Sequence, residues 1–231
     1  MIFPLEEIRK FKIQKLQNEF FINSNQNMMN INYPMMNQNM IMNFNNPMMM
    51  NMDMNQNMMM IMNNPLIYQQ FLVFQNNLQN INSVNFDDCF EYYQKIECFS
   101  GVNAMYCNIC KNHVPASYQT FLYTTPEILI IILNRGKGIE FNVKMEFTET
   151  LNLYNYVERK ETGYIYKLIG LVTHNGESGT SGHFNACCKS RINDKWYLYN
   201  DDFVTEIFNF KQDIIEYAIT CILFYEKNNN F

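Results

Sequence analysis

The sequence lacks a long apolar run and any cluster of basic residues, and each absence excludes a class of protein. Its longest apolar stretch, residues 128–133, is far shorter than the roughly 20 residues that a transmembrane helix needs. The formal net charge of −5, with no Lys- or Arg-rich segment, argues against nucleic acid as the main partner. The sequence therefore predicts neither a membrane nor a nucleic-acid partner.

A secretory signal is also missing. Residues 2–21 have no continuous apolar centre, because charged residues interrupt them, and their apolar side chains recur at the spacing of one helical face: Leu5, Ile8, Phe11, Leu16 and Phe20. We therefore interpret residues 1–22 as a short amphipathic helix. Seven cysteines, an odd number, without a leader favour a reducing compartment. We expect a soluble protein of the cytoplasm or nucleus.

Residues 23–64 consist almost entirely of Asn and Met and hold 15 of the 18 methionines, so they dominate the composition. Asn-rich polar segments bury too little apolar surface to offset the entropy of ordering, so this low-complexity tract is predicted to be disordered. Thioether sulfurs are soft ligands, which makes copper binding an alternative. The irregular Met clusters, with no His or Cys nearby, argue against copper.

The remaining residues, 65–227, form the predicted folded domain. Residues 66–74 fit either a strand or the edge of a helix. Residues 83–93 begin a helix with acidic side chains near its N-terminus, and Cys89 on this helix is interpreted as a core thiol.

Later segments of this domain are predicted to be mainly strands. The β-branched run 128–133 is typical of a buried strand in the middle of a sheet, and residues 218–225 form a closing apolar strand after a helix-like stretch at 211–217. The domain is therefore predicted to be α+β, with an antiparallel sheet built mostly from residues after Ala116.

Residues 182–204 are the most informative stretch. Alternation along 183–188 and again along 196–199 is typical of two strands, and the polar segment between them fits a turn. Antiparallel pairing brings His183, near the start of one strand, close to Asn200, near the end of the other. A histidine that takes a proton from a thiol must be held in one tautomer, and a carboxamide that accepts from its second nitrogen does this.

A lone histidine beside a glycine in a strand is more often structural than catalytic. Here His183, the strand that begins at Trp196 and the Asn200-Asp201 pair occur together, at a spacing that a hairpin allows. Gly182, directly before the histidine, would let a substrate backbone approach closely. We therefore interpret His183 as the candidate base.

Gly182-His183-Phe184, followed by an aromatic strand that ends in Asn200-Asp201, resembles the histidine box of the ubiquitin-specific proteases, which are papain-like cysteine deubiquitinases. Other segments resemble the same family in the expected order: Pro126 to Arg135, Lys144, Leu151 and Leu153, and the closing strand 218–225. The resemblance covers about residues 83–225. It implies a papain-like α+β fold that is partial here, with a palm sheet and a reduced fingers region, and ubiquitin or ubiquitinated proteins as partners.

The resemblance also implies roles for single residues. His183 would be the base, Asn200 its orienter and Asp201 a polar group that aids the oxyanion, in thiol-dependent hydrolysis of isopeptide or peptide bonds at the ubiquitin C-terminus. His174, the alternative histidine, would be structural. The glycine-rich segment 176–182 would be a mobile loop over the cleft that accepts the ubiquitin tail, and its small residues would permit the motion.

Cys107 and Cys110 form a Cys-x-x-Cys knuckle, which can present two thiolates to one zinc ion. A structural zinc site needs four ligands, so this pair is half a site. The family carries a second such pair upstream, which this sequence lacks, and the nearby Cys98 and His113 do not match its spacing. We expect no required cofactor and consider a structural zinc at Cys107 and Cys110, the alternative being a knuckle whose thiols stay free.

The nucleophile box of the family, Gly-x-x-Asn-x-Gly-Asn-x-Cys, is absent, and no cysteine precedes Cys89. Cys187 and Cys188 follow His183 on the same strand and could not face it across a cleft. Cys221 is predicted to lie in a buried strand, and Cys98, Cys107 and Cys110 in the fingers, distant from the active site.

Three interpretations follow. The chain is a truncated deubiquitinase, a catalytically inactive scaffold that binds ubiquitin, or an unrelated α+β domain. We also expect marginal stability, because removing the first helical layer of such a domain would expose an apolar sheet face.

Overall fold

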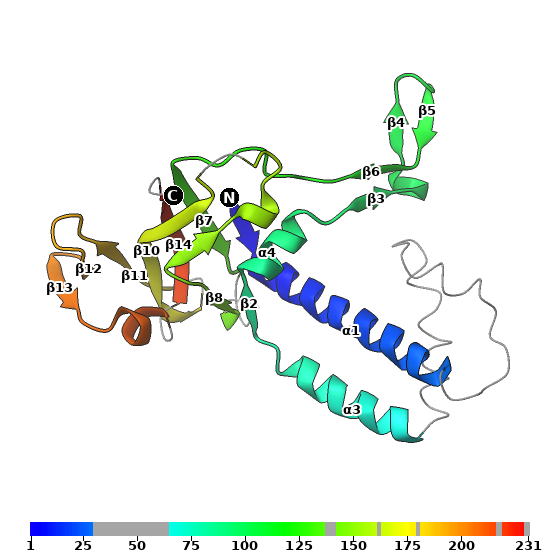
Figure 1. Cartoon of the computed structure of the whole chain (residues 1–231), viewed down its shortest axis with the longest axis horizontal. Helices are drawn as coiled ribbons and strands as arrows, with labels where there is room; N and C mark the ends of the chain where they lie inside the picture. Colours follow the sequence, from blue (N-terminus) through cyan, green and yellow to red (C-terminus); the bar gives the residue numbers. More distant parts are fainter. Residues whose placement is uncertain (30–64, 137–141, 161–162, 179–180, 216–218, 229–231) are drawn as a thin grey trace. The chain divides into compact units, whose positions relative to one another are not determined.

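The computed structural model describes residues 1–29, 65–136, 142–160, 163–178, 181–215 and 219–228. The chain forms two compact units (Figure 1). We call residues 1–12, 82–95 and 120–231 the palm unit, and residues 13–81 and 96–119 the finger unit. Helix α1 (Leu5–Met29) begins in the first and ends in the second. No helix in the described part of the chain is long and apolar enough to cross a membrane.

An eight-stranded sheet organises the palm unit, in the order β1-β7-β14-β10-β11-β12-β13, with β9 paired to β10. Only β1 and β7 run parallel; the other neighbours are antiparallel. The sheet comprises β1 (Ile2–Pro4), β7 (Ile128–Asn134), β9 (Thr150–Asn152), β10 (Ile165–Ser178), β11 (Ser181–Lys189), β12 (Trp196–Asn200), β13 (Phe203–Ile207) and β14 (Ile219–Lys227). The sheet is thus mostly antiparallel and comes from residues after Ala116, as predicted, with one N-terminal strand added.

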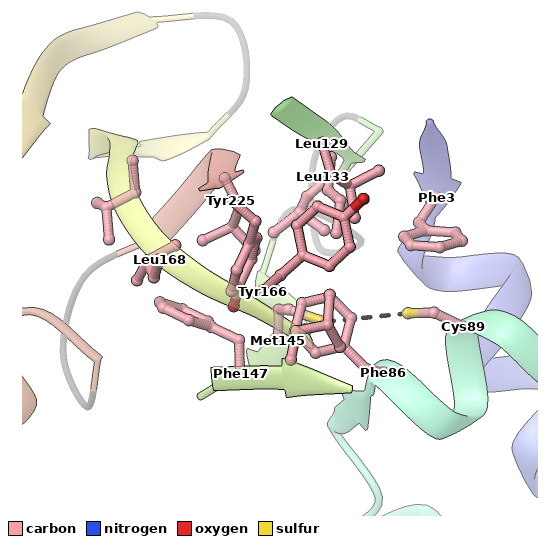
Figure 2. Close-up of a cluster of buried hydrophobic side chains, with 14 of the residues drawn as sticks. Phe3, Phe86, Cys89, Leu129, Leu133, Met145, Phe147, Tyr166, Leu168 and Tyr225 are labelled. Carbon is pink, nitrogen blue, oxygen red and sulfur yellow. Dashed lines mark hydrogen bonds between the residues drawn. The ribbon is translucent and has the colours of Figure 1, made fainter. Parts of the chain in front are cut away.

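One face of this sheet carries the core of the palm unit. Helix α4 (Phe86–Tyr93) packs on it through Phe90, which is fully buried and contacts Phe3 edge-on and Tyr156 face to face, at ring-centroid distances of 5.4 and 4.5 Å. Cys89 lies in the same core, as predicted, with its Sγ 4.0 Å from the Met145 Sδ. Figure 2 shows side chains from several strands and α4 meeting here: Phe3, Phe86, Cys89, Leu129, Leu133, Met145, Phe147, Tyr166, Leu168 and Tyr225.

Local hydrogen bonds fix the start of α4. The Asn85 side chain accepts from the Asp88 backbone N–H, and the Asp88 carboxylate accepts from the Asn85 N–H, both at 2.9 Å. This reciprocal cap satisfies two backbone donors that the first helical turn leaves unpaired. Lys12 of α1 donates to Asp88 at 2.9 Å, so one carboxylate joins both helices. The predicted helix therefore starts at Phe86, after a short strand β2 (Ser83–Asn85) that pairs with β8 (Lys144–Glu146).

Two expectations about the chain's strands and helices need correction. The run 128–133 was expected to be buried as a continuous strand, but β7 alternates: Ile128, Ile130 and Ile132 are exposed, so one face of this strand has no cover among the described residues. The N-terminal segment is more than an amphipathic helix, because residues 2–4 form β1 and Leu5 and Ile8 belong to the palm core.

The helix also passes the predicted boundary at residue 22 and continues to Met29. Of the Asn/Met tract, residues 30–64 lie outside the described residues. Near the C-terminus, the helix-like stretch is a single π-helical turn, Lys211–Ile215. Residues 216–218 likewise lie outside the described part.

The finger unit combines helices and two small hairpin ladders. Residues 66–74 are helical, within α3 (Pro65–Gln79), and Phe71 and Ile67 are buried with Phe21 of α1. Strand β3 (Glu97–Phe99) pairs with β6 (Ala116–Tyr118), and β4 (Met105–Cys107) pairs with β5 (Asn112–Val114) between them in sequence. The β4–β5 hairpin is thus nested within the β3–β6 pair.

Candidate functional site

Strands β11, β12 and β13 build the site around His183. β11 pairs with β12 from Ala186 to Lys189, and β12 pairs with β13 through Asn200 opposite Phe203. The turn between β12 and β13 has only two residues, and Asp201 takes a left-handed conformation in it, with a φ of 52°. Asp tolerates this conformation better than most residues, which explains why a tight turn forms here.

The turn places Asn200 beside His183. The His183 Nε2 lies 2.7 Å from the Asn200 Oδ1, and the histidine side chain is 45% exposed. An amide oxygen only accepts, so Nε2 carries the hydrogen and donates it. Nδ1 then has a free lone pair on an exposed ring, which is the arrangement a general base requires.

Asp201 adds a negative charge close to the same nitrogen. Its Oδ2 lies 3.6 Å from the His183 Nε2, which is too long for a hydrogen bond but close enough for electrostatic attraction. The carboxylate is 74% exposed, so solvent screens much of this attraction. The three residues proposed from the sequence are therefore within reach of one another, with Asn200 as the direct partner.

His174 has a different environment. It is buried, and its ring lies edge-on against Phe184 at a centroid distance of 4.7 Å. A Cβ on Gly176 would lie 2.7 Å from the His174 Cε1, and a Cβ on Gly182 only 2.3 Å from it. Both positions therefore need glycine so that the backbone can close over the ring. His174 is a packing residue beneath the segment that leads to His183.

Sequence reasoning missed this role of the glycines, because it considered Gly176 and Gly182 only in relation to substrate and to loop motion. The mobile loop predicted for residues 176–182 lies partly outside the described residues, at 179–180. Its described flanks belong to β10 and β11, which still pair at Ser178 and Ser181.

A row of buried polar residues, which sequence reasoning also missed, runs beside the site. Asn185, Thr173 and Thr220 lie opposite one another on β11, β10 and β14 and are nearly inaccessible to solvent. The Asn185 Oδ1 and the Thr220 Oγ1 have no hydrogen-bond partner among the described residues. Asn185 lies two residues after His183 and therefore on the same face of the strand. This alternation was the sequence signal that could have placed Asn185 beside the site.

No cysteine of the palm unit stands beside His183. Cys187 shares its face but lies four residues along the strand, about 13 Å away at strand spacing, and burial raises the pKa of its thiol to about 12. Cys188 faces the opposite side, and Cys221 lies two strands away on β14. Burial raises the pKa of Cys89, Cys188 and Cys221 as well. None of these thiols is placed or activated as a partner for the histidine.

The candidate metal residues lie at the β4–β5 hairpin. The Cys110 backbone N–H donates to the Cys107 Sγ at 3.4 Å, and this bond, with another from Ile109, lowers the pKa of Cys107. In the described part of the chain, no group of three or more His, Cys, Asp or Glu side chains is arranged to hold a metal ion. The described residues therefore supply two of the four ligands that a structural zinc needs, and they do not fit a complete site.

A model of the ubiquitin carboxyl-terminal hydrolase family matches residues 11–225. The chain belongs to this family. Among its relatives, ubiquitin carboxyl-terminal hydrolase 12 of Saccharomyces cerevisiae is 35% identical over 133 residues, which are 54% of this chain and 10% of that protein. Ubiquitin carboxyl-terminal hydrolase 4 of Mus musculus is 30% identical over 150 residues, which are 62% of this chain and 15% of that protein. The chain thus spans only a small part of the length of these relatives.

Solved structures confirm the fold. The SAGA DUB module Ubp8/Sgf11/Sus1/Sgf73 bound to monoubiquitin contains a chain that matches with a TM-score of 0.51 and 25% identity. The match covers 64% of this chain and 35% of that one. A second structure of the yeast module gives the same scores and coverage. The resemblance to ubiquitin-specific proteases and the papain-like α+β fold are therefore confirmed. The region matched is about a third of the chain in the solved structure.

Proposed function

We propose that this chain carries the base-and-orienter half of a deubiquitinase active site and binds the C-terminal tail of ubiquitin beside His183. The observation that carries the proposal is the 2.7 Å contact between the His183 Nε2 and the Asn200 Oδ1. Membership of the ubiquitin carboxyl-terminal hydrolase family supplies the substrate class. The SAGA DUB module, which contains a chain of the same fold, is bound to monoubiquitin in its solved structure, and this supports the same partner.

The chemistry assigned to the chain is proton transfer. The His183 Nδ1 accepts the proton of a cysteine thiol, and the resulting thiolate attacks the carbonyl carbon of the isopeptide or peptide bond at the ubiquitin C-terminus. The imidazolium then returns the proton to the leaving amine, and water later releases ubiquitin from the thioester. Asn200 keeps the ring in the tautomer that leaves Nδ1 free, and Asp201 is assigned to polar stabilisation near the oxyanion.

The thiol in this scheme is not a cysteine of the palm unit, because those four are buried, turned away or displaced along the sheet from His183. This same observation favours a second candidate function, a scaffold that binds ubiquitin without cleaving it. The two candidates differ in whether His183 contacts the ubiquitin tail, since a scaffold has no need of that contact.

The test is a binding titration of the purified chain with intact ubiquitin and with ubiquitin that lacks its C-terminal tail. We expect removal of the tail to weaken binding, and His183→Ala to weaken binding of intact ubiquitin about 3- to 10-fold, the value of one hydrogen bond. The matched control is His113→Ala, which replaces an exposed histidine of the finger unit and should change nothing. Equal affinity of wild type and His183→Ala would favour the scaffold.

A second arm uses ubiquitin with a thiol-reactive electrophile at its C-terminus. The proposal predicts no covalent adduct with the chain alone. An adduct that disappears in His183→Ala would show that one of the chain's own cysteines is the nucleophile. Absence of any ubiquitin binding by the folded chain would contradict both candidate functions.

A further inference from the structure

The eight-stranded sheet ends in two edge strands, and they differ in how well they are protected against pairing with another chain. β1 (Ile2–Pro4) has three residues and ends in a proline, which has no backbone N–H to donate. β13 (Phe203–Ile207) has five residues, with no proline and no lysine. Short length, proline and lysine are the usual protections of an edge strand. In the described part of the chain no strand pairs with the outer side of β13 (Figure 1), so its outward backbone groups are open to a further strand.

The most exposed side chains of β13 are apolar. Phe203 is 76% exposed and Val204 is 58% exposed. The one charged residue of the strand, Glu206, is paired with Lys195 at 2.7 Å, so its charge is already matched. Consecutive residues of a strand point to opposite faces, so Phe203 and Val204 project on the two faces of the sheet. A strand added along β13 would therefore cover apolar surface on both faces.

The start of β13 adjoins the candidate site. Phe203 lies opposite Asn200, and residues opposite each other in a sheet share a face. The Asn200 side chain in turn contacts His183 at 2.7 Å. Phe203 is therefore the neighbour of the His183–Asn200 pair on the same face. A substrate whose reacting bond lies over His183 brings its adjoining residues to Phe203.

The turn that precedes β13 is acidic. Asp201 and Asp202 are both exposed, and within the described ranges neither forms an ion pair with a lysine or arginine. Two carboxylates beside an apolar edge attract a segment that is apolar and positively charged. A ubiquitinated protein presents a lysine at the bond to be cleaved, so its residues near that lysine are the part of the substrate that can meet this corner.

A lysine side chain also fits the space between an added strand and His183. Neighbouring strands are about 4.8 Å apart, so a strand added to β13 lies about 10 Å from β12. The aliphatic stem of a lysine packs along apolar surface while its end stays free. Phe203, exposed and on the His183 face, offers that surface to a lysine that reaches from the added strand towards the site.

We propose that β13 binds an extended segment of the ubiquitinated target protein by strand addition, with the stem of the ubiquitinated lysine lying across Phe203. Backbone hydrogen bonds to the free edge hold the segment, and side-chain contacts select it. Residues next to the lysine contact Val204 on the other face, and a basic residue further along lies near Asp202. The substrates are therefore conjugates whose lysine sits in an extended segment, with apolar neighbours and basic residues beyond them. This inference rests on the proposed function, because it needs the ubiquitin tail beside His183.

The test compares the affinity of the full chain for ubiquitin alone and for ubiquitin joined by an isopeptide bond to a peptide. The central lysine of the peptide carries ubiquitin and has two valines on each side, with a lysine at each end. We expect the conjugate to bind about 10-fold more tightly than ubiquitin, and amide hydrogen exchange along 203–207 to slow. Methylation of the valine nitrogens, which removes their N–H groups, should abolish the gain. No gain, or an equal gain from the methylated conjugate, would overturn the inference.

Matched variants locate the contact. Phe203→Ala should reduce the gain from the peptide about 3-fold and leave the affinity for ubiquitin alone unchanged. Asp202→Asn should reduce the gain only at low salt. The control is Phe121→Ala, which removes another exposed phenyl ring of the palm unit and should leave the gain intact. Retained far-ultraviolet circular dichroism shows that the variants fold. An equal effect of Phe203→Ala and Phe121→Ala would overturn the inference.

The free peptide separates this inference from the proposed function. At high concentration it should slow amide exchange along 203–207 without ubiquitin. Protection of β13 by the peptide, together with no binding of ubiquitin, would contradict the proposed function and support the edge as a binding site. Binding of ubiquitin that the attached peptide does not strengthen would overturn the inference and leave the proposed function standing.

Discussion

Two hairpins carry the candidate chemistry of this chain, and they are built differently. The His183 hairpin, β11–β12, belongs to an eight-stranded sheet with a buried core behind it, and Trp196, directly after its turn, stacks on Phe210 at a ring-centroid distance of 3.8 Å. The Cys107 hairpin, β4–β5, has strands of three residues each, none of whose residues is buried. Tertiary packing therefore positions His183 and Asn200, whereas only local backbone hydrogen bonds position Cys107 and Cys110.

The contrast shows how tertiary packing preorganises a site. A pair of side chains at the end of a packed sheet keeps its geometry because moving it would disturb the core. A short exposed hairpin has no such support, and a two-stranded hairpin by itself is only marginally stable in water. The geometry of the palm site should therefore be sensitive to core mutations, and that of the finger hairpin should not.

The largest expected effect is from Phe90→Ala in the palm core. The ring is fully buried between Phe3 and Tyr156, so its loss should lower the free energy of unfolding by about 3–5 kcal/mol. Tyr106→Ala in the finger hairpin, where the ring is about half exposed, should cost less than about 1 kcal/mol. Urea unfolding measures both. Equal losses in the free energy of unfolding would show that tertiary packing supports the two hairpins to the same extent.

The next largest effect is expected from Gly182→Ala. Gly101→Ala is its matched control, because both glycines have a positive φ. A Cβ at Gly182 would meet the His174 ring at 2.3 Å, and relieving this overlap should cost up to about 3 kcal/mol and separate His183 from Asn200. A Cβ at Gly101 meets nothing within 4 Å, so only backbone strain of about 1 kcal/mol remains. Unfolding experiments give the costs, and the His183 ring signals in NMR should move only in Gly182→Ala.

Thiol reactivity gives a smaller, site-resolved comparison. At neutral pH an alkylating reagent followed by mass spectrometry should modify Cys107 quickly, because its pKa is lowered and the thiol is accessible, and should spare buried Cys89 and Cys187 until the chain unfolds. Rapid labelling of Cys187 in the folded chain would contradict its burial.

The last effect is the pH dependence that the palm thiols introduce, which is absent at neutral pH. Burial raises the pKa of Cys187 from 9.0 to about 12, so above about pH 9 the unfolded chain loses this proton while the folded chain keeps it. The unfolded state then binds fewer protons, and the free energy of unfolding falls as the pH rises from about 9 towards 12. Cys187→Ala should flatten part of this fall in urea titrations. An identical pH profile for the variant would contradict the assignment.

The sequence was sufficient for the His183 hairpin because its information is local. Alternating residues defined both strands, and their pairing brought His183 and Asn200 together without knowledge of the rest of the fold. It was insufficient for β1 and β7. The parallel pairing of residues 2–4 with residues 132–134 joins segments that are distant in the sequence. A three-residue strand is too short for its sequence pattern to predict which strand it pairs with.

The sequence also could not predict which side chains of a strand are buried. The run 128–133 contains only Ile and Leu, so its pattern could not reveal that alternate side chains would be exposed. Asn185 and Gly182 show the same limit at the site, because a polar residue facing inward and a glycine pressed against His174 are recognised only when the neighbouring strand is in place. The Cys-x-x-Cys spacing, by contrast, identified the knuckle directly but could not supply ligands from elsewhere.

The most direct test of the central claim is the ¹⁵N NMR spectrum of the His183 imidazole, recorded with intact ubiquitin and with ubiquitin lacking its C-terminal tail. The account predicts the Nε2–H tautomer in the free chain, its loss in Asn200→Ala, and a shift of the ring signals on addition of intact ubiquitin only. An Nδ1–H tautomer, or a ring that responds equally to both forms of ubiquitin, would contradict the assignment of His183 and Asn200 as the base and orienter of a deubiquitinase site.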